Sequence, residues 1–197
     1  MSTKLVLASA SPRRKELLEQ IGIEFQVFQV DLDESMRPGE AVLAHVERLA
    51  LEKAQLGYSR LSAQQSGLAV LAADTVVEID GQVLGKPAST QQAAAFLARL
   101  SGKKHKVHTA VAVVTRAKAL HAVSSSEVEF MELSEQQIAA YVETGEPMDK
   151  AGAYAIQGIA AQFVVNLNGS YSGVMGLPLH ETARLLSACD ISSMISI

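Results

Sequence analysis

The chain begins with an apolar stretch that leads into a turn and an amphipathic segment. Residues 5–8 (LVLA) predict a short strand, and the leucines that follow the turn recur at helical spacing. Ser11 is suited to the N-cap of that helix, Pro12 to its first position and Gly22 to its end. The pattern therefore predicts a strand, a tight turn and a helix within the first 22 residues.

The same periodicities divide the rest of the chain into strands and helices. Helices are expected at 38–56, 89–102, 133–147 and 176–189. Strands are expected at 25–30, 67–79, 105–115, 119–131 and 162–167. Asp80 and Gly81 predict a two-residue hairpin turn, and Ser134 with Gln137 predicts a capping box. Because strands and helices do not alternate strictly, we expect a mixed α/β fold, a mixed sheet flanked by helices.

Composition places the chain among ordinary soluble globular proteins. Its 197 residues are 48% hydrophobic and 19% charged, enough for one domain or two small lobes. The net charge of −4 offers no basic footprint for nucleic acid. A single cysteine, Cys189, excludes an internal disulfide framework and a cysteine-based zinc site. No apolar run is long enough for a signal peptide or a membrane span, so we expect a cytoplasmic protein.

Positive charge gathers where it is electrostatically disfavoured. Arg13, Arg14 and Lys15 occupy the first turn of the first predicted helix, although a helix N-terminus is already partially positive. A bound anion would remove this conflict, and the free N–H groups of such a turn suit phosphate. Ser9, Ser11 and the two arginines are therefore candidates for phosphate binding. The alternative is a helix cap with solvated surface cations.

Asp74 interrupts a strand, residues 67–79, that is otherwise apolar on both faces. A carboxylate there is costly unless it meets a metal, a cation or several donors. The alternatives are that the strand ends at Ala73 or that Asp74 caps a loop. The predicted hairpin register places Thr75 opposite Lys86, which brings Lys86 within about one residue of Asp74. Taken alone, Lys86 is better explained as a surface lysine.

Three further positions are candidates with strong alternatives. Lys53 lies on the apolar face of its predicted helix, where it either extends along the surface to solvent, the better default, or enters a polar cleft. Asp33 and Glu34 could help Asp74 to hold a hard divalent cation, although a solvated acidic loop is the commoner interpretation. The amide of Gln157 both donates and accepts, as reading a base edge requires, but is weak evidence alone.

Several other kinds of site are absent from the sequence. It contains neither a Walker P-loop nor a Gly-x-Ser-x-Gly nucleophile elbow. The histidines show no metal-ligand spacing: they are His45, His105, His108, His121 and His180.

Five motifs resemble, in their order along the chain, those of the Maf family of nucleotide pyrophosphatases. They are LASASPRR, ERLALEKA, AADTVV…GKP, KAGAYAIQG and NGSYSGVMGLPL. The resemblance implies a cytoplasmic enzyme that hydrolyses a nucleoside triphosphate to the monophosphate and pyrophosphate. It also implies a divalent cation (Mg²⁺ or Mn²⁺), a homodimer, and one domain over residues 1–197. The implied fold is similar to that of inosine-triphosphate pyrophosphatases, with substrate in a cleft between two lobes.

Three positions resemble the branch of this family that acts on dTTP and UTP. Arg13, Thr75 and Gln157 match that branch, whereas the branch acting on 7-methyl-GTP carries Trp, Gln and Glu there. The last difference has a physical sense, because a carboxylate only accepts hydrogen bonds and suits the donor-rich edge of guanine. An amide both donates and accepts, as uracil and thymine require.

These motifs carry a set of expected roles. We assign the general base to Asp74, acting with a metal or mainly as its ligand, and give Glu34 a secondary role in binding metal or orienting water. Ser9 and Ser11 would donate to phosphate oxygens. The cations expected to bind and neutralise the triphosphate are Arg13, Arg14, Lys53 and Lys86, the last counted among the catalytic residues. Two alternatives stay open: a nucleotide-binding regulator of septum formation that needs no turnover, and a 7-methyl-GTP pyrophosphatase.

Overall fold

The computed structural model describes residues 4–62 and 67–195. Its strands are β1 (Lys4–Leu7), β2 (Gln26–Val27), β3 (Leu68–Ile79), β4 (Gln82–Leu84), β5 (Lys104–Thr115), β6 (Ala119–Phe130) and β7 (Val164–Asn168). Its α-helices are α1 (Pro12–Gln20), α2 (Val42–Leu61), α3 (Thr90–Leu100), α4 (Glu135–Glu143), α5 (Tyr171–Met175) and α6 (Leu179–Ser187). Three 3₁₀ helices lie between α4 and β7: η1 (Glu146–Asp149), η2 (Ala151–Ala153) and η3 (Ile159–Phe163).

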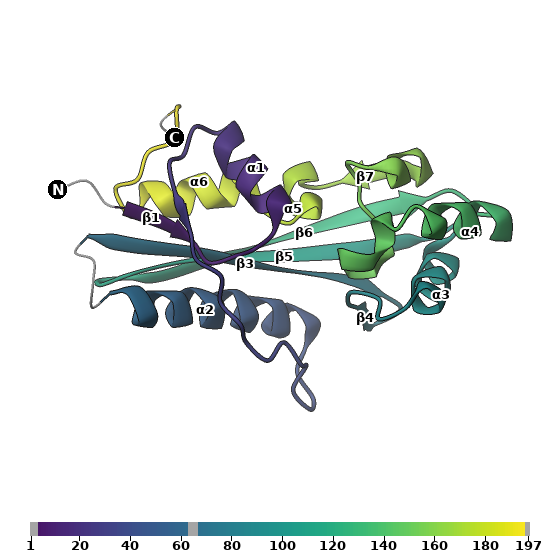
Figure 1. Ribbon diagram of the computed structural model, residues 1–197, viewed down its shortest axis with the longest axis horizontal. Helices are drawn as coiled ribbons and strands as arrows, with labels where there is room; N and C mark the ends of the chain where they lie inside the picture. The colour runs from purple at the N-terminus through teal and green to yellow at the C-terminus, as the bar shows by residue number, and fades with distance from the viewer. Residues whose placement is uncertain (1–3, 63–66, 196–197) are drawn as a thin grey trace. The chain divides into compact units, whose positions relative to one another are not determined.

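The strands form one mixed sheet, which confirms the predicted fold class (Figure 1). Their order is β2-β1-β3-β5-β6-β7, and β4 pairs with β3 away from this path. β1 runs parallel to both of its neighbours, whereas β4 and β7 run antiparallel to theirs. Within the described ranges no helix combines the length and the apolar character that crossing a membrane requires.

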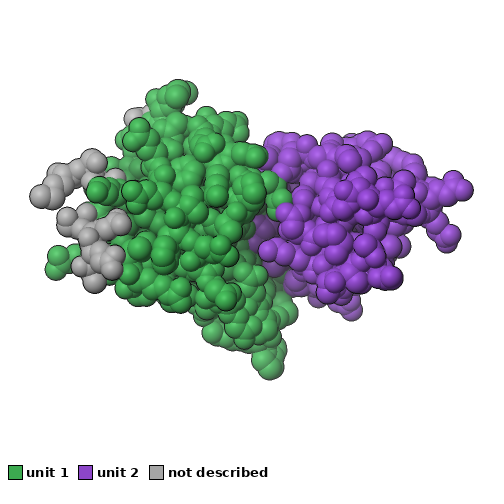
Figure 2. Space-filling model, viewed as in Figure 1, with its two compact units in different colours: residues 1–74, 109–124, 176–197 green, residues 75–108, 125–175 purple. Residues whose placement is uncertain are grey.

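The chain divides into two compact units, in agreement with the two lobes expected from the sequence (Figure 2). Unit 1 comprises residues 1–74, 109–124 and 176–197, and unit 2 comprises residues 75–108 and 125–175. The division falls inside the three longest strands, so that β3, β5 and β6 each contribute residues to both units. In β3 it falls between Asp74 and Thr75.

In unit 1 the helices cover both faces of the strands, with α2 on one face and α1 and α6 on the other (Figure 1). The first six residues of β3 are buried because they are covered on both sides. Gly57 allows α2 to approach closely, since a Cβ there would lie 3.0 Å from Val70 Cγ1 and 3.3 Å from Ala8 Cβ. This close packing fixes the height of α2 above the strand that carries Asp74.

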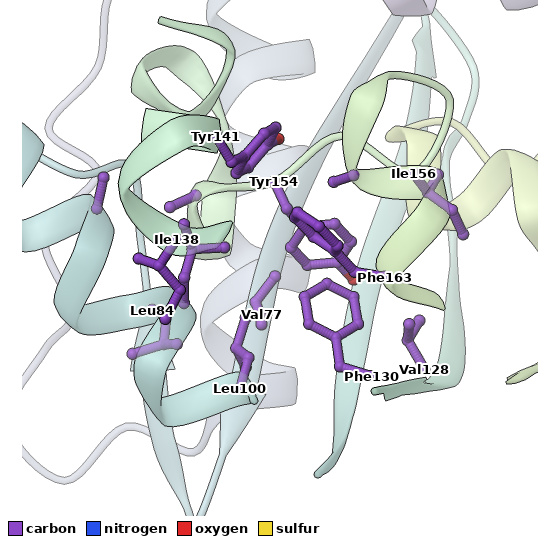
Figure 3. Packing of buried hydrophobic residues seen from close by; sticks show 14 of the residues in the cluster. Val77, Leu84, Leu100, Val128, Phe130, Ile138, Tyr141, Tyr154, Ile156 and Phe163 are labelled. Atoms are coloured by element: carbon purple, nitrogen blue, oxygen red, sulfur yellow. The ribbon is translucent and has the colours of Figure 1, made fainter. Parts of the chain in front are cut away.

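The core of unit 2 combines aliphatic side chains with a group of aromatic rings (Figure 3). The rings of Phe130 and Tyr154 meet edge to face with their centroids 4.8 Å apart, and Tyr141 meets Phe163 in the same way at 5.2 Å. α3 packs against α4. The capping box predicted at the start of α4 is present: the Ser134 hydroxyl accepts from Gln137 N–H, and the Gln137 amide oxygen accepts from Ser134 N–H.

His105 makes the stability of this core depend on pH. Its ring is buried against Phe130, its Nε2 lies 2.9 Å from Tyr154 Oη, and burial lowers its pKa to about 4 from 6.5. The unfolded chain then binds the proton more tightly than the folded chain, so stability falls as the pH drops from about 6.5 towards 4. We expect the free energy of unfolding to fall by about 2 kcal/mol between pH 7 and pH 5 through this group.

Urea denaturation at the two pH values measures this loss. His105→Gln should remove most of that dependence, whereas His180→Gln, at an exposed position on α6, should leave it as in the wild type. A dependence that survives unchanged in His105→Gln would contradict the assignment.

Two predicted elements differ from those observed. The strand expected at 25–30 is reduced to β2, because β2 pairs with β1 and β1 ends at Leu7. Phe28 N–H still donates to Leu7 O at 3.0 Å, but β1 offers no residue beyond Leu7 for pairing. The helix expected from residue 38 begins at Val42 instead. A turn precedes it, in which Glu40 N–H donates to Arg37 O at 3.0 Å and Gly39 adopts a φ of +74°.

Candidate active site

The turn between β1 and α1 is organised around the buried hydroxyl of Ser9. This hydroxyl accepts from Ser11 N–H at 3.2 Å and from Arg14 Nη1 at 3.3 Å. Arg14 Nε also donates to Gly176 O at 2.8 Å, which ties the start of α1 to the segment before α6. Ser11 occupies the predicted N-cap, but its side chain makes no capping bond. Both hydroxyls carry a proton that a phosphate oxygen could accept.

The half-buried Arg14 lies in the field of two carboxylates. Burial lowers the pKa of Arg14, the charges of Asp74 and Glu34 raise it, and the neighbouring Arg13 lowers it again. The cations of α1 therefore share a local environment with acidic side chains from β3 and from the segment after β2. Arg14 is therefore not a solvated surface cation, which was the alternative interpretation of this turn.

Asp74 is buried in the middle of β3, which continues to Ile79. The interpretations in which the strand ends at Ala73, or in which Asp74 caps a loop, are therefore wrong. Its carboxylate is compensated by a cation: Lys53 Nζ donates to Asp74 Oδ1 at 2.7 Å. A buried charge on this strand is tolerated because it is paired.

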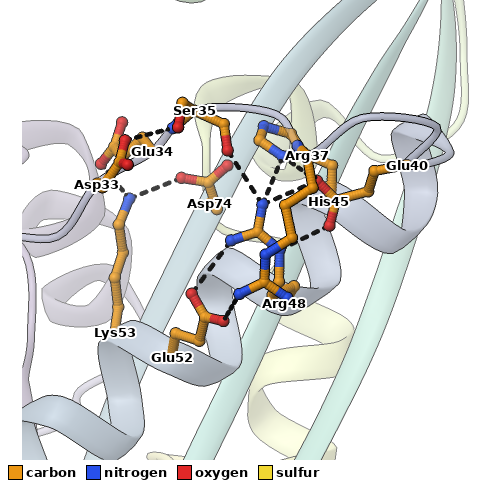
Figure 4. A network of polar contacts seen from close by, with 10 residues as sticks. All are labelled: Asp33, Glu34, Ser35, Arg37, Glu40, His45, Arg48, Glu52, Lys53 and Asp74. Carbon is orange, nitrogen blue, oxygen red and sulfur yellow. Dashed lines mark hydrogen bonds and ion pairs between the residues drawn. The ribbon is translucent and has the colours of Figure 1, made fainter.

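Lys53 joins Asp74 to Glu34 (Figure 4). Its side chain is only 10% exposed, and its Nζ lies 2.5 Å from Glu34 Oε1. The expectation that Lys53 reaches along the surface to solvent is therefore wrong, because its ammonium group contacts two carboxylates instead. One ammonium group brings two carboxylates together from segments that are 40 residues apart in the sequence.

Replacing Lys53 should destabilise the fold. In Lys53→Met the Asp74 carboxylate stays buried without this cation, so we expect the free energy of unfolding to fall by about 3 kcal/mol. Lys106→Met, at an exposed position of β5, is the matched control and should change stability by less than about 0.5 kcal/mol. Urea denaturation compares the two, and equal stabilities would show that the Lys53 pairs contribute nothing to the fold.

Asp74 and Glu34 supply carboxylate oxygens of the kind that a hard divalent cation prefers as ligands. Mg²⁺ commonly uses one or two carboxylates together with phosphate oxygens rather than a cage made only of protein. Residues 4–62 and 67–195 contain no group of three histidine, cysteine, aspartate or glutamate side chains that could hold a metal by themselves. The third acidic candidate, Asp33, makes a different contact. Its carboxylate accepts from Ser35 N–H at 2.9 Å, and this hydrogen bond lowers the pKa of Asp33.

The remaining sequence candidates belong to unit 2. The hairpin register is confirmed, with Val77 opposite Leu84, but β4 ends at Leu84. The predicted pairing of Thr75 with Lys86 is therefore wrong, because the described ladder stops two residues short and Lys86 is exposed beyond it. Thr75 is half-buried in β3, and Gln157 is exposed in a turn before η3.

Glu146, which the sequence did not single out, holds the segment that carries Gln157. Its carboxylate accepts from Tyr141 Oη at 2.8 Å and from Ile159 N–H at 3.1 Å. Gly158 leaves room for this carboxylate, since a Cβ there would overlap it. The sequence contains only part of the signal for this contact, namely the glycine that follows Gln157. Glu146, whose carboxylate needs the space at that glycine, lies 12 residues before it in the chain.

Comparisons with known proteins agree with the resemblance. The family model described as "Maf-like protein" matches residues 4–189. A dTTP/UTP pyrophosphatase of Methylobacillus flagellatus is 52% identical over 190 residues, covering 96% of this chain and 94% of its own. One from Shewanella denitrificans is 53% identical over 188 residues, covering 93% and 94%. Among solved structures, the Ham1 protein of Staphylococcus aureus superposes with a TM-score of 0.50 at 14% identity, covering 94% of this chain and 97% of its own, and so shares the fold.

Proposed function

The chain belongs to the Maf-like protein family, and on that basis we propose that it is a nucleoside triphosphate pyrophosphatase that hydrolyses dTTP and UTP. Relatives about 50% identical over nearly the whole chain carry the name dTTP/UTP pyrophosphatase. The observation that carries the proposal is the buried Asp74–Lys53 pair, which Lys53 joins to Glu34, with Arg14 in the field of both carboxylates. Pyrophosphate release needs a carboxylate that accepts a proton, cations that bind the phosphates and a second carboxylate that helps to hold a metal. This arrangement supplies groups of each kind.

Asp74 is the proposed general base. It would accept a proton from a water molecule whose oxygen attacks the α-phosphorus of the nucleotide. The bond from that phosphorus to the bridging oxygen of the β-phosphate breaks, and pyrophosphate leaves with its electron pair. Burial of Asp74 beside Lys53 holds the carboxylate in one orientation, which is the condition for in-line attack.

The cationic residues would bind and neutralise the triphosphate. Arg13 and Arg14 supply planar guanidinium donors at the start of α1, next to the hydroxyls of Ser9 and Ser11. Lys53 and Lys86 supply compact charges. A bound divalent cation, Mg²⁺ or Mn²⁺, would be held by Asp74 and Glu34 and would neutralise charge that develops on the phosphates.

Base selection is assigned to Thr75, Gln157 and Arg13. The Gln157 amide would match the alternating donors and acceptors on the edge of a uracil or thymine ring. Glu146 stabilises the turn in which Gln157 lies, so that the amide is presented from a fixed backbone. We further expect residues 1–197 to act as one domain, in a homodimer, in the cytoplasm.

A pyrophosphate-release screen tests the proposal. The purified protein is incubated with Mg²⁺ and a panel of canonical and modified nucleoside triphosphates, with 7-methyl-GTP included. We expect release of pyrophosphate from dTTP and UTP well above that from the purine nucleotides. Tight nucleotide binding without release would favour a binding regulator instead, and preferential release from 7-methyl-GTP would favour the other branch of the family.

A further inference from the structure

Glu34 lies in a segment that lacks regular secondary structure. Between β2 and α2, residues 28–41 form neither helix nor strand, and the Glu34 side chain is 51% exposed. The packing that holds Asp74 in β3 is therefore not available to Glu34. A carboxylate on such a segment keeps one position only if other contacts fix its neighbours.

Arg48 supplies contacts of that kind (Figure 4). Its Nε donates to Glu40 Oε1 at 2.6 Å and its Nη2 to Glu40 Oε2 at 2.8 Å, a bidentate pair. The same Nη2 donates to the carbonyl oxygen of Ser35 at 3.2 Å. Arg48 thus binds the segment at the residue after Glu34 and again near its end.

The Arg48 guanidinium is itself held in place by a second residue of α2. Arg48 Nη1 donates to Glu52 Oε2 at 3.1 Å, one turn along the helix, which aims the guanidinium at the segment. Arg48 and Glu40 are 13% and 10% exposed, so solvent screens the pair less than an ordinary surface ion pair. The hydrogen bonds from Arg48 hold the pKa of Glu40 well below its usual range, so the pair stays charged at neutral pH.

The helix that carries Arg48 also carries Lys53, five residues later. Consecutive residues of the segment are therefore bound to one rigid element: Glu34 through Lys53 Nζ, and Ser35 through Arg48. We propose that Arg48 is a positioning residue, which with Glu40 and Glu52 forms a clasp that presents the Glu34 carboxylate beside Lys53 and Asp74. The proposal rests on the proposed function, in which Glu34 serves the reaction.

Arg48→Gln and Arg37→Gln form a matched pair of variants. Arg37 also contacts Glu52, at 2.9 Å, but its side chain is 63% exposed. We expect Arg48→Gln to lower kcat for UTP by about 30-fold with KM changed less than about 3-fold, because a small displacement of a reacting group is costly. Arg37→Gln should change kcat by less than about 2-fold, since exposed ion pairs contribute little.

A double-mutant cycle identifies the path of the effect. If Arg48 acts through Glu34, then adding Arg48→Gln to Glu34→Gln should lower kcat by less than about 3-fold further. An equal loss in both backgrounds would overturn the proposal, since Arg48 would then act independently of Glu34. Circular dichroism and thermal melting establish that each variant is folded before its kinetics are compared.

Hydrogen exchange tests the clasp without any turnover. In Arg48→Gln the amides of residues 34–37 and 40 should exchange about tenfold faster than in the wild type, while those of β3 stay unchanged. Unchanged exchange in that segment would overturn the proposal whatever the kinetics. If the wild-type protein releases no pyrophosphate, the proposed function fails, and the exchange result alone then shows whether the clasp exists.

Discussion

Asp74→Asn should lower kcat for dTTP and UTP hydrolysis by about 10²–10⁴-fold while the protein stays folded and still binds nucleotide. An asparagine has the size of the aspartate, and its Oδ1 can still accept from Lys53 Nζ, but it cannot take a proton from water. Initial rates of pyrophosphate release measure the loss, and equilibrium binding of UTP measures the retained affinity.

Asp31→Asn is the matched control for that variant. Asp31 is an exposed aspartate of the acidic segment after β2, and its replacement should change kcat by less than about 2-fold. A fully active Asp74→Asn protein would remove Asp74 from the mechanism. Loss of UTP binding together with turnover would assign Asp74 to substrate or metal binding rather than to proton transfer.

The second large effect concerns the choice of base. The combined change Arg13→Trp, Thr75→Gln and Gln157→Glu should shift the ratio of kcat/KM for UTP to that for 7-methyl-GTP by about 10³-fold towards 7-methyl-GTP. A carboxylate at position 157 would leave the N–H donor of the pyrimidine matched but its carbonyl acceptors unpaired. A tryptophan at position 13 would stack on the large, positively charged methylated base, which repels an arginine.

Kinetic efficiencies for dTTP, UTP and 7-methyl-GTP on the wild type and the triple variant decide this. A matched control is Gln92→Glu, which makes the same chemical change at an exposed position in the first turn of α3 and should leave the ratio unaltered. If all three efficiencies fall by one factor in the triple variant, these positions support catalysis generally and do not select the base.

Local features of the chain were predictable to within a few residues. The Ser11-Pro12 start of α1, the Asp80-Gly81 hairpin and the capping box of α4 appear where the sequence placed them. Each depends on hydrogen bonds or turn geometry between residues at most a few positions apart, and such interactions are encoded by residue type and spacing. The order of the motifs along the chain likewise indicates the family without reference to any tertiary contact.

Contacts between distant segments set the chemistry of the site, and the patterns of the chain do not encode them. Lys53 lies on an apolar stripe, so periodicity alone favours a side chain that reaches solvent; it is buried instead because Asp74, 21 residues away, offers a charge on the facing strand. Arg14 meets a carbonyl 162 residues away, and Arg48 meets Ser35 and Glu40 across a turn that no periodicity predicts.

Sequence patterns thus specified the elements, the hairpin register and the types of residue that could handle a triphosphate. Tertiary packing selected which of those residues meet: it paired Lys53 with both Asp74 and Glu34, left the Asp33 carboxylate bonded to the Ser35 N–H, and ended β4 before Lys86. The physical reason is range. Propensity and periodicity act over a few residues, whereas the pairing of a buried charge depends on which segments the sheet and α2 bring within 3 Å of each other.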